Sequence, residues 1–457
     1  MKDYESFGPM YFPHKFPDIW EKIKEMFTSK IETISDLNKI FFQDNSRFLK
    51  ELEKNYPEDG KEFINIFQNI SSLVLDSEKI FPKGEIDSLK MNTTDKIILT
   101  RKQVALIFIL GFFDIFNLDP KKSNVYQRYD FHSILNANNG SNFSKGRCLF
   151  NYLTIIGKWL GENNKLLEEN VTYIRENKEF NIKDFSHIEK LCDIKIIEKG
   201  SLFDSDASFC VDFANKYIGG GVLSGGCVQE EILFVVEPEA IVSIFFMEKM
   251  EDNDAIRIDN LIHFSNYSGY GRSFKYEESA IKKGEIKKHN IIAIDAVCDY
   301  SKGGINKESV ERDLIKAYIG FNLINLEEEN VLKLKKTIAT GNWGCGAFGG
   351  DFELKFIQQW LAATFAGVEK LYYYTFERKE MNFVNENLKK MESYKAYDLY
   401  LAMNTEVLLK GEVLKIIINR YENSNKNHPT GETFELEEVK GNNKKKETCC
   451  DKLCDIY

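Results

Sequence analysis

The sequence predicts an α/β fold, in which a mixed sheet is flanked by helices and preceded by a mostly α-helical region. Up to about residue 190, apolar residues recur at the spacing of helix faces. Beyond that point, short β-branched and aromatic runs alternate with helical patterns, which is typical of a sheet covered by helices. A chain of 457 residues also exceeds the size at which a single hydrophobic core stops growing, so we expect two domains.

The first region, residues 1–190, is predicted to be a helical accessory domain. The run "CLFNYLTIIGKWL" carries an apolar stripe at helical spacing, formed by Leu149, Leu153, Ile156 and Leu160. The most apolar run, "VALIFILGFF", is followed at once by an aspartate and is too short to span a bilayer. We therefore expect a buried helix there and no membrane contact.

The second region, residues 191–421, is predicted to be the α/β domain. The runs that predict its strands are "IKIIEKGSLF", "FCVDF", "IIAIDAV" and "LYYYTF". Between the last two runs, "FIQQWLAATFAG" has the apolar spacing of a helix. Residues 422–457 are polar and contain few large apolar side chains, so we expect a mobile tail outside both domains.

Composition limits the classes of function. The formal net charge of −10 argues against sequence-specific binding of nucleic acid, which needs a basic footprint. The first residues lack the basic start and apolar run of a secretory signal, and the nine cysteines are scattered like reduced thiols. We therefore expect an intracellular protein, nuclear or cytoplasmic. Cys449, Cys450 and Cys454 lie together but match no zinc spacing, and the six histidines lie apart, so no metal site is predicted.

Two glycine-rich segments lie in the second region. "GGGVLSGGCVQEE", residues 219–231, places five glycines before two adjacent glutamates. "TGNWGCGAFGGD", residues 340–351, precedes a predicted helix, whose first N–H groups and positive dipole end suit a phosphate. Loops that follow strands of one α/β sheet meet at one crevice and can hold a ligand with two phosphates. Carboxyl groups beside such a ligand suit the cleavage of a glycosidic bond.

Together these segments resemble the poly(ADP-ribose) glycohydrolase family. "GGGVLSGGCVQEE" resembles the family signature, in which three glycines are followed, after a short spacer, by Gln-Glu-Glu. "VDFANKYIGGG", "YSGYGRSF" and "TGNWGCGAFGGD" resemble the family as well. The resemblance implies a macrodomain-like catalytic domain after a helical accessory domain, acting on poly(ADP-ribose) chains of modified proteins in the DNA damage response. It implies release of ADP-ribose, mainly from chain ends, without a cofactor.

Carried over residue by residue, the resemblance implies that Glu231 is the catalytic acid. Glu230 and Asn215 would hold the ribose beside the scissile bond and orient Glu231. Asp212 would support the loop, and Gln229 would assist in that geometry.

The resemblance also implies which residues surround the ADP-ribose. The backbone of both loops would wrap the diphosphate, through Gly219, Gly220, Gly221, Gly344, Gly346, Ala347 and Gly349. The aromatic side chains that would cover or wall the ligand are Tyr267, Tyr270, Phe348 and Phe376. Leu202 and Phe203 fall roughly where the family binds adenine.

The chemistry of ribose–ribose cleavage is compatible with these roles. The leaving hydroxyl needs a proton, and the sugar passes through an oxocarbenium-like state. Glu231 can supply the proton if the charge of Glu230 and the phosphates of the ligand keep it protonated near neutral pH. In a helix the two side chains can reach one ribose, whereas in a strand they would face opposite sides. We therefore expect a helix or turn over "QEEILF".

Other interpretations stay open from the residues alone. A macrodomain that binds ADP-ribose without cleaving it would need no acid beside the bond. The G-x-G-x-x-G pattern of the second loop would also suit a dinucleotide-dependent oxidoreductase. Adjacent glutamates are often a solvated face, the two tyrosines could be core residues, and Asp212 and Asn215 could be turn residues that bond their own backbone. Cleavage within a polymer chain is expected only if the far ribose edge is open.

Overall fold

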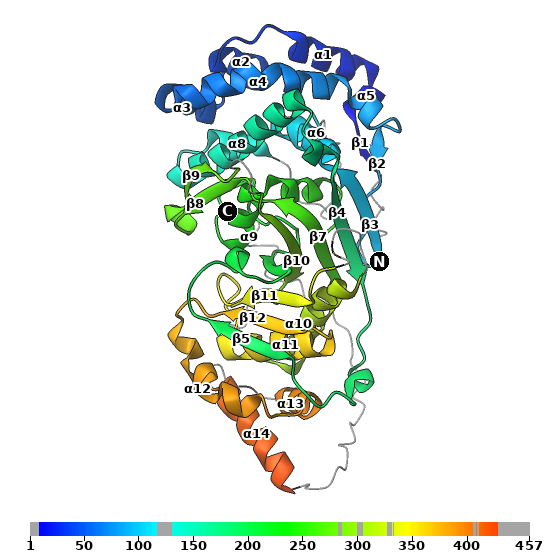
Figure 1. Ribbon diagram of the computed structural model, residues 1–457, viewed down its shortest axis with the longest axis vertical. Coiled ribbons are helices and arrows are strands. Elements are labelled where there is room, and N and C mark those ends of the chain that lie inside the picture. The colour runs from blue at the N-terminus through cyan, green and yellow to red at the C-terminus, as the bar shows by residue number, and fades with distance from the viewer. Residues whose placement is uncertain are drawn as a thin grey trace.

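The computed structural model describes residues 9–427, apart from 117–129, 282–285, 299–304, 327–330, 332, 405–407 and 409–410. Within this part of the chain, a central mixed sheet of eight strands lies between two groups of helices (Figure 1). The N-terminal helices form one end of the elongated molecule, and α12 to α14 form the other. The predicted α/β class with a preceding helical region is confirmed.

The strands of the central sheet follow the spatial order β3-β4-β7-β10-β6-β11-β12-β5. In chain order they are β3 (Asp95–Thr100), β4 (Asn170–Asn177), β5 (Asp193–Ile197), β6 (Phe209–Ala214), β7 (Asp254–Ile262), β10 (Lys288–Asp295), β11 (Thr337–Gly341) and β12 (Lys370–Tyr374). From β10 to β5 the pairs are parallel, and from β3 to β10 they are antiparallel. Two short pairs lie outside this sheet, β1 (Met10–Tyr11) with β2 (Glu85–Ile86) and β8 (Ser265–Ser268) with β9 (Lys275–Ser279).

Helices cover both faces of the sheet. On one side lie α1 (Pro17–Thr28), α2 (Ile34–Phe42), α3 (Arg47–Asn55), α4 (Pro57–Leu75), α5 (Ser77–Ile80), α6 (Arg101–Phe112), α7 (Phe131–Asn136), α8 (Gly140–Glu162) and α9 (Gln229–Val236). On the other side lie α10 (Lys307–Asn322), α11 (Phe352–Phe365), α12 (Asn382–Met391), α13 (Ala396–Met403) and α14 (Val413–Asn427).

Strand β10 shows how the sheet separates two hydrophobic cores. Ile291 and Ala293 belong to the core shared with the N-terminal helices, whereas Ile292 and Ile294 belong to the core under α10 and α11. This alternation is the period of a strand, and apolar residues at every position indicate a strand buried on both faces. The four predicted strand runs and the predicted helix after the second glycine loop are confirmed as β5, β6, β10, β12 and α11.

The N-terminal region is less purely helical than the sequence predicts. Strands β3 and β4 lie before residue 190 and extend the sheet by antiparallel pairing onto β7. Arg175, in the middle of β4, is fully buried and donates to Asp254 at 2.8 Å, and such a charge masks the apolar pattern of a buried strand. One hydrophobic core runs from the N-terminal helices to the sheet, so the domain boundary near 190 remains a prediction.

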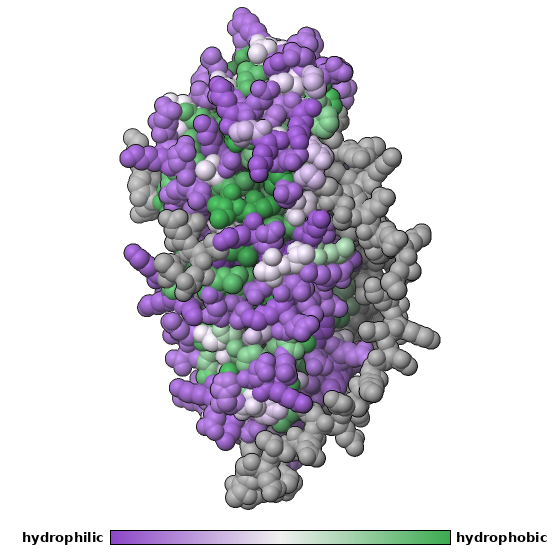
Figure 2. Space-filling view, turned by 90° about the vertical axis from the view of Figure 1, so that its right-hand side faces the viewer, coloured by the Kyte–Doolittle hydropathy of each residue, from purple (hydrophilic) through white to green (hydrophobic). Residues whose placement is uncertain are grey.

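The apolar run of the N-terminal region forms the buried helix α6, as predicted. No helix in the described ranges is long and apolar enough to cross a membrane. Figure 2 shows the side of the molecule that carries β3 and β4. The surface on this side is mostly hydrophilic, and hydrophobic residues gather in patches near its middle. Helix α14 includes residues 422–427 of the predicted tail, and the remaining tail residues, Cys449, Cys450 and Cys454 among them, lie outside the described residues.

Candidate active site

The two glycine loops follow neighbouring strands. Strands β6 and β11 pair in parallel, so their carboxyl ends lie at the same edge of the sheet. The first loop, residues 215–228, follows β6, and the second, residues 342–351, follows β11. A Cβ atom built on Gly341 would lie only 3.6 Å from the ring of Phe213, which shows how near the two strand ends are. The fold therefore brings both loops to one edge, as the sequence predicts.

The residues Gln229, Glu230 and Glu231 form the first turn of α9. The helical backbone expected from the chemistry is thus present. Glu230 is 3% exposed and Glu231 is 6% exposed, so the pair is not a solvated helix face.

The glycine loop holds both carboxyl groups through its backbone. Glu230 accepts hydrogen bonds from the N–H groups of Asn215, at 2.9 Å, and Gly219, at 2.6 Å. Glu231 accepts from the N–H groups of Gly221, at 2.9 Å, and Val228, at 2.7 Å. Four donors from one loop fix the positions of two adjacent carboxyl groups.

Gly220 lies between the two carboxyl groups and has to be a glycine. Its φ of 49° is in the left-handed region. A Cβ atom there would lie 2.5 Å from Oε2 of Glu230 and 2.6 Å from Oε1 of Glu231. The glycine cluster therefore lets the loop close around the carboxyl groups themselves.

Gln229 and Asn215 act on the backbone around the pair. Gln229 accepts from the N–H of Phe213 at 2.8 Å and donates to the carbonyl of Val211 at 3.0 Å, which clips α9 onto β6. Asn215 accepts from the N–H of Tyr217 at 3.0 Å, so its side chain also forms the local turn.

Asp212, fully buried in β6, adds a third carboxyl group to this cluster. Neither of its oxygens has a hydrogen-bond partner within the described residues. Burial, and then the charge of Glu231, raises the pKa of Asp212 well above its usual value. Burial, and then the charges of Asp212 and Glu231, raises the pKa of Glu230 well above its usual value. Asp212 and Glu230 therefore retain protons above the ordinary range of carboxyl groups.

The second loop is closed on itself and leads into α11. The N–H of Gly350 donates to the carbonyl of Gly344 at 2.9 Å, and Asp351 caps the helix by accepting from the N–H of Leu354 at 3.0 Å. A Cβ atom on Gly346 would meet nothing within 4 Å, so one side of the turn is open. The predicted ligand contacts in this turn are Gly344, Gly346, Ala347 and Gly349.

The two predicted tyrosines lie in and after β8. Tyr267 is half-buried, with its ring 5.6 Å from that of Phe274, whereas Tyr270 is 58% exposed. The N–H of Gly271 donates to the carbonyl of Cys227 at 2.9 Å, so this hairpin turn contacts the first glycine loop. Tyr267 thus has partly core surroundings, and Tyr270 stands at the edge of the site.

The predicted aromatic walls follow two strands at the same edge of the sheet. Phe376 lies two residues after the end of β12, is 40% exposed and has a φ of 53°, which is uncommon for a bulky residue and often marks a functional position. Phe348, in the second loop, is half-buried and packs against the core under α11.

The predicted adenine contacts lie in a short 3₁₀ helix, η4 (Leu202–Asp204). Leu202 and Phe203 are 2% and 8% exposed and belong to the core shared with the N-terminal helices. Their side chains offer little surface in this structure, and an adenine contact at these residues remains a prediction.

The expectation that all histidines stay apart is wrong for two of them. His263, just after β7, and His289, in β10, both contact Glu237, the residue that follows α9. The reason is the antiparallel pairing of β7 and β10, which joins positions 26 residues apart in the sequence (289 minus 263).

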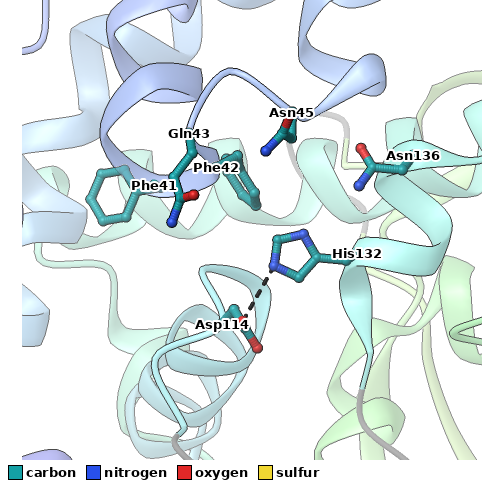
Figure 3. Close-up of a pocket in the computed structure, with 7 residues that line it drawn as sticks. All are labelled: Phe41, Phe42, Gln43, Asn45, Asp114, His132 and Asn136. Carbon is teal, nitrogen blue, oxygen red and sulfur yellow. Dashed lines mark hydrogen bonds and ion pairs between the residues drawn. The ribbon is translucent and has the colours of Figure 1, made fainter.

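A separate surface pocket lies in the helical region. Its volume is about 520 Å³, and its lining residues are Phe41, Phe42, Gln43, Asn45, Asp114, His132 and Asn136 (Figure 3). His132 and Asp114 point toward each other across it, 3.3 Å apart. No residue predicted for the active site lines this pocket.

Comparison with family models assigns both parts of the chain. Residues 55–175 match the helical domain of poly(ADP-ribose) glycohydrolase, and residues 182–383 match its macrodomain fold. The chain belongs to the poly(ADP-ribose) glycohydrolase family.

Relatives of this family come from plants and animals. Poly(ADP-ribose) glycohydrolase 1 of Arabidopsis thaliana is 29% identical over 65% of this chain and 67% of its own length. Probable poly(ADP-ribose) glycohydrolase 2 of the same plant is 28% identical over 64% of this chain and 65% of its own length, so this chain spans about two thirds of these relatives. Poly(ADP-ribose) glycohydrolase 1 of Caenorhabditis elegans is 37% identical over 43% of this chain and 27% of its own.

A solved structure of a poly(ADP-ribose) glycohydrolase was also matched, that of Deinococcus radiodurans in complex with ADP-ribose. It is 14% identical, with a TM-score of 0.30, over 45% of this chain and 86% of that chain.

In this member of the poly(ADP-ribose) glycohydrolase family, Lys145 is a residue of the site that the sequence analysis missed. It lies in α8, is fully buried, and donates to the carbonyls of Ser224 and Gly226, both at 2.7 Å. Burial lowers its pKa to about 8. The sequence does contain a hint of this role. Lys145 lies four residues before Leu149, so it falls on the apolar stripe of α8. A lysine at a core position of that stripe indicates a buried acceptor.

Proposed function

We propose that the protein is a poly(ADP-ribose) glycohydrolase that hydrolyses ribose–ribose O-glycosidic bonds and releases ADP-ribose. One observation carries this proposal: two adjacent buried carboxyl groups at the start of α9 are held by the backbone of a glycine loop, beside a second glycine loop. A diphosphate ligand that lies along the two loops would present its ribose to these carboxyl groups.

Glu231 has the role of acid and base in this proposal. It donates its proton to the leaving ribose hydroxyl as the glycosidic bond breaks and the sugar becomes oxocarbenium-like. A water molecule then adds to the anomeric carbon and gives its proton to the ionised Glu231, which restores the starting state. Glu230 and Asn215 hold the ribose, and Gln229 and Asp212 fix the turn that carries the pair.

The surroundings of the pair support an ADP-ribose unit as the ligand. Backbone N–H groups of the second loop bind the diphosphate, whose charge offsets part of the positive charge on the sugar, while the N–H groups of Gly219 and Gly221 continue to hold the two glutamates. Tyr270 and Phe376, both exposed at the edge of the site, suit contact with the flat parts of the ligand. We expect cleavage mainly at chain ends, with internal cleavage where the far ribose edge is open.

The decisive experiment compares four proteins on purified poly(ADP-ribose). The unmodified protein should release ADP-ribose, and Glu231→Gln should lose at least about 10²-fold in turnover, because general acid–base catalysis contributes about 10²–10⁴-fold. Glu230→Gln should also lose activity. Glu308→Gln, an exposed glutamate in the first turn of α10, is the matched control and should stay active.

The results distinguish a hydrolase from a macrodomain that only binds ADP-ribose, and they test the role of Glu231. Intact polymer with the unmodified protein would reject the hydrolase, and undiminished cleavage by Glu231→Gln would reject Glu231 as the acid. Polymer that is bound but left intact by the unmodified protein would instead identify a macrodomain that reads ADP-ribose. We further propose that the protein acts in the nucleus or the cytoplasm, where its localisation can be imaged directly.

A further inference from the structure

Three side chains from separate parts of the chain converge at the carboxyl end of α9. Glu237 directly follows the helix, His263 follows β7, and His289 lies in β10. One ligand atom from each of the three residues lies within 4.8 Å of the other two. This cluster is not part of the proposed catalytic apparatus, which lies at the opposite end of α9.

The carboxyl group of Glu237 is the centre of the cluster. Its Oε1 contacts Nδ1 of His289 and lies 3.5 Å from Nδ1 of His263. Glu237 is fully buried and the side chain of His289 is 8% exposed, whereas the side chain of His263 is 14% exposed. His263 is therefore the residue of the cluster nearest to solvent.

Both ring nitrogens of His289 have acceptors, whereas other polar atoms of the cluster have no hydrogen-bond partner among the described residues. Nε2 of His289 lies 3.0 Å from the carbonyl of Phe203, which can only accept, so the hydrogen of a neutral imidazole sits on Nε2. A hydrogen between Nδ1 of His289 and Oε1 of Glu237 joins this pair when no metal is bound, and a metal ion would take the place of that hydrogen. Nδ1 of His263 and Oε2 of Glu237 have no hydrogen-bond partner among the described residues.

We propose that Glu237, His263 and His289 bind a divalent transition-metal ion of the zinc class. Two imidazole nitrogens and one carboxylate oxygen are ligands that zinc prefers, and a water molecule would complete four-coordination. The carbonyl of Phe203 supports this reading, because metal-binding histidines usually donate their other ring N–H to a carbonyl or carboxylate.

The proposed ion would have a structural role. It would tie the end of α9 to β7 and β10, while the first turn of the same helix carries Glu230 and Glu231. A helix of eight residues has little stability of its own, so a fixed carboxyl end also fixes the orientation of its first turn.

The test measures metal binding by the full-length protein and is independent of the glycohydrolase activity. The chain is stripped with a chelator and titrated with Zn²⁺ and then Co²⁺, with bound metal measured after dialysis. We expect about one ion per chain, a rise in the melting temperature with metal, and a cobalt spectrum of nitrogen and oxygen ligands. A thiolate-to-cobalt charge-transfer band would instead assign the ion to cysteines and overturn the proposal.

Two variants and a control locate the site. His263→Gln and His289→Gln should each weaken Zn²⁺ binding more than about tenfold, since even residues behind the ligands contribute about 10–100-fold. His187→Gln, an exposed histidine outside the cluster, should bind like the unmodified protein. If His289→Gln fails to fold, the partly exposed His263 still gives the answer. Absence of stoichiometric Zn²⁺ in the unmodified protein, or equal binding by His263→Gln, would overturn the proposal, and the histidines would then be protonated partners of Glu237.

Discussion

Single residues around the paired glutamates show how burial sets their chemistry. Lys145 is a buried cation whose only described hydrogen-bond acceptors are carbonyl groups of the first glycine loop, including Gly221 at 3.5 Å. Asp212 is a buried acid whose oxygens lack hydrogen-bond partners among the described residues. Burying a charged or ionisable side chain is unfavourable for folding, and both of these side chains lie beside Glu231. We therefore attribute their presence to a role in the site and not to a gain in stability.

Replacement of Lys145 by methionine tests its positioning role. We expect the free energy of unfolding to fall by about 1–3 kcal/mol, because the loop carbonyls lose a charged donor in a buried place. We also expect kcat/KM of the unmodified protein to fall as pH rises through about 8, the pKa of Lys145, and this decline to be absent in the variant. Lys158→Met, which removes a partly exposed lysine of the same helix and its surface ion pair with Glu62, should change neither quantity measurably. An unchanged pH profile would leave Lys145 a purely structural residue.

Replacement of Asp212 by asparagine tests the carboxyl cluster. A carboxyl group with a raised pKa binds its proton more tightly in the folded than in the unfolded protein. Its contribution to stability is therefore lost as pH rises above the ordinary carboxyl range towards its folded pKa. Urea unfolding at about pH 5 and about pH 8 should show a smaller decrease in stability for Asp212→Asn than for the unmodified protein. Asp87→Asn, at an exposed position, should keep the full decrease.

At the scale of elements, the short helix α9 and the loop before it form one unit. The loop supplies N–H groups to Glu230 and Glu231, and Gln229 returns two hydrogen bonds to β6. The glutamates are thus positioned by backbone that immediately precedes them in the chain. Small changes in this backbone should act on both carboxyl groups together.

Gly220→Ala tests that coupling, with Gly367→Ala as its matched control. Both glycines have left-handed backbone, at φ of 49° and 71°, so each substitution costs about 1–2 kcal/mol from the backbone alone. Only at Gly220 would the new Cβ meet the carboxyl oxygens, whereas at Gly367 it meets nothing within 4 Å. We expect Gly220→Ala to lose about 10²-fold or more in turnover and Gly367→Ala to stay active. Equal activities, measured on purified polymer, would contradict the geometry.

At the scale of the whole molecule, the helical region and the sheet share one hydrophobic core. Strands β3 and β4 continue the sheet beyond β7, and Lys145 and Asn151 of α8 bond to the macrodomain half. Arg147 of the same helix stacks between Tyr56 and Tyr276, at 3.8 and 4.5 Å from their ring centroids. The helical region is therefore part of the structure that supports the site.

A chain that begins at residue 191 tests this unity. Without β3, β4 and the N-terminal helices, the edge of β7 and one face of the sheet would be exposed, so we expect an aggregating or unfolded product. The full chain should unfold in one calorimetric transition. Two separate transitions, or a soluble fragment with a cooperative transition of its own, would support the predicted boundary near 190 as a true domain boundary.

Much of this architecture could be predicted from the sequence because the relevant signals are local. The strand runs, the helix after the second loop and the helical turn at Glu230 depend on neighbouring residues. Strand β4 could not be predicted, because the partners of Arg175 are distant in the chain, among them the acid Asp254 and the carbonyl of Lys249. Lys145 and the cluster around Glu237 depend likewise on contacts between segments far apart in the chain. Long-range partners leave no periodic trace in one sequence.

The hydrogen bonds from Lys145 to the first glycine loop fix the orientation of two peptide groups. In a trans peptide the C=O and the next N–H point in opposite directions, and the described chain has no cis peptide. The carbonyls of Ser224 and Gly226 point at the ammonium, so the N–H groups of Gly225 and Cys227 are turned away from it. A cation on one side thus polarises two amides whose hydrogens face the other side, and in the proposed complex α8 would strengthen the attraction for the diphosphate without touching it.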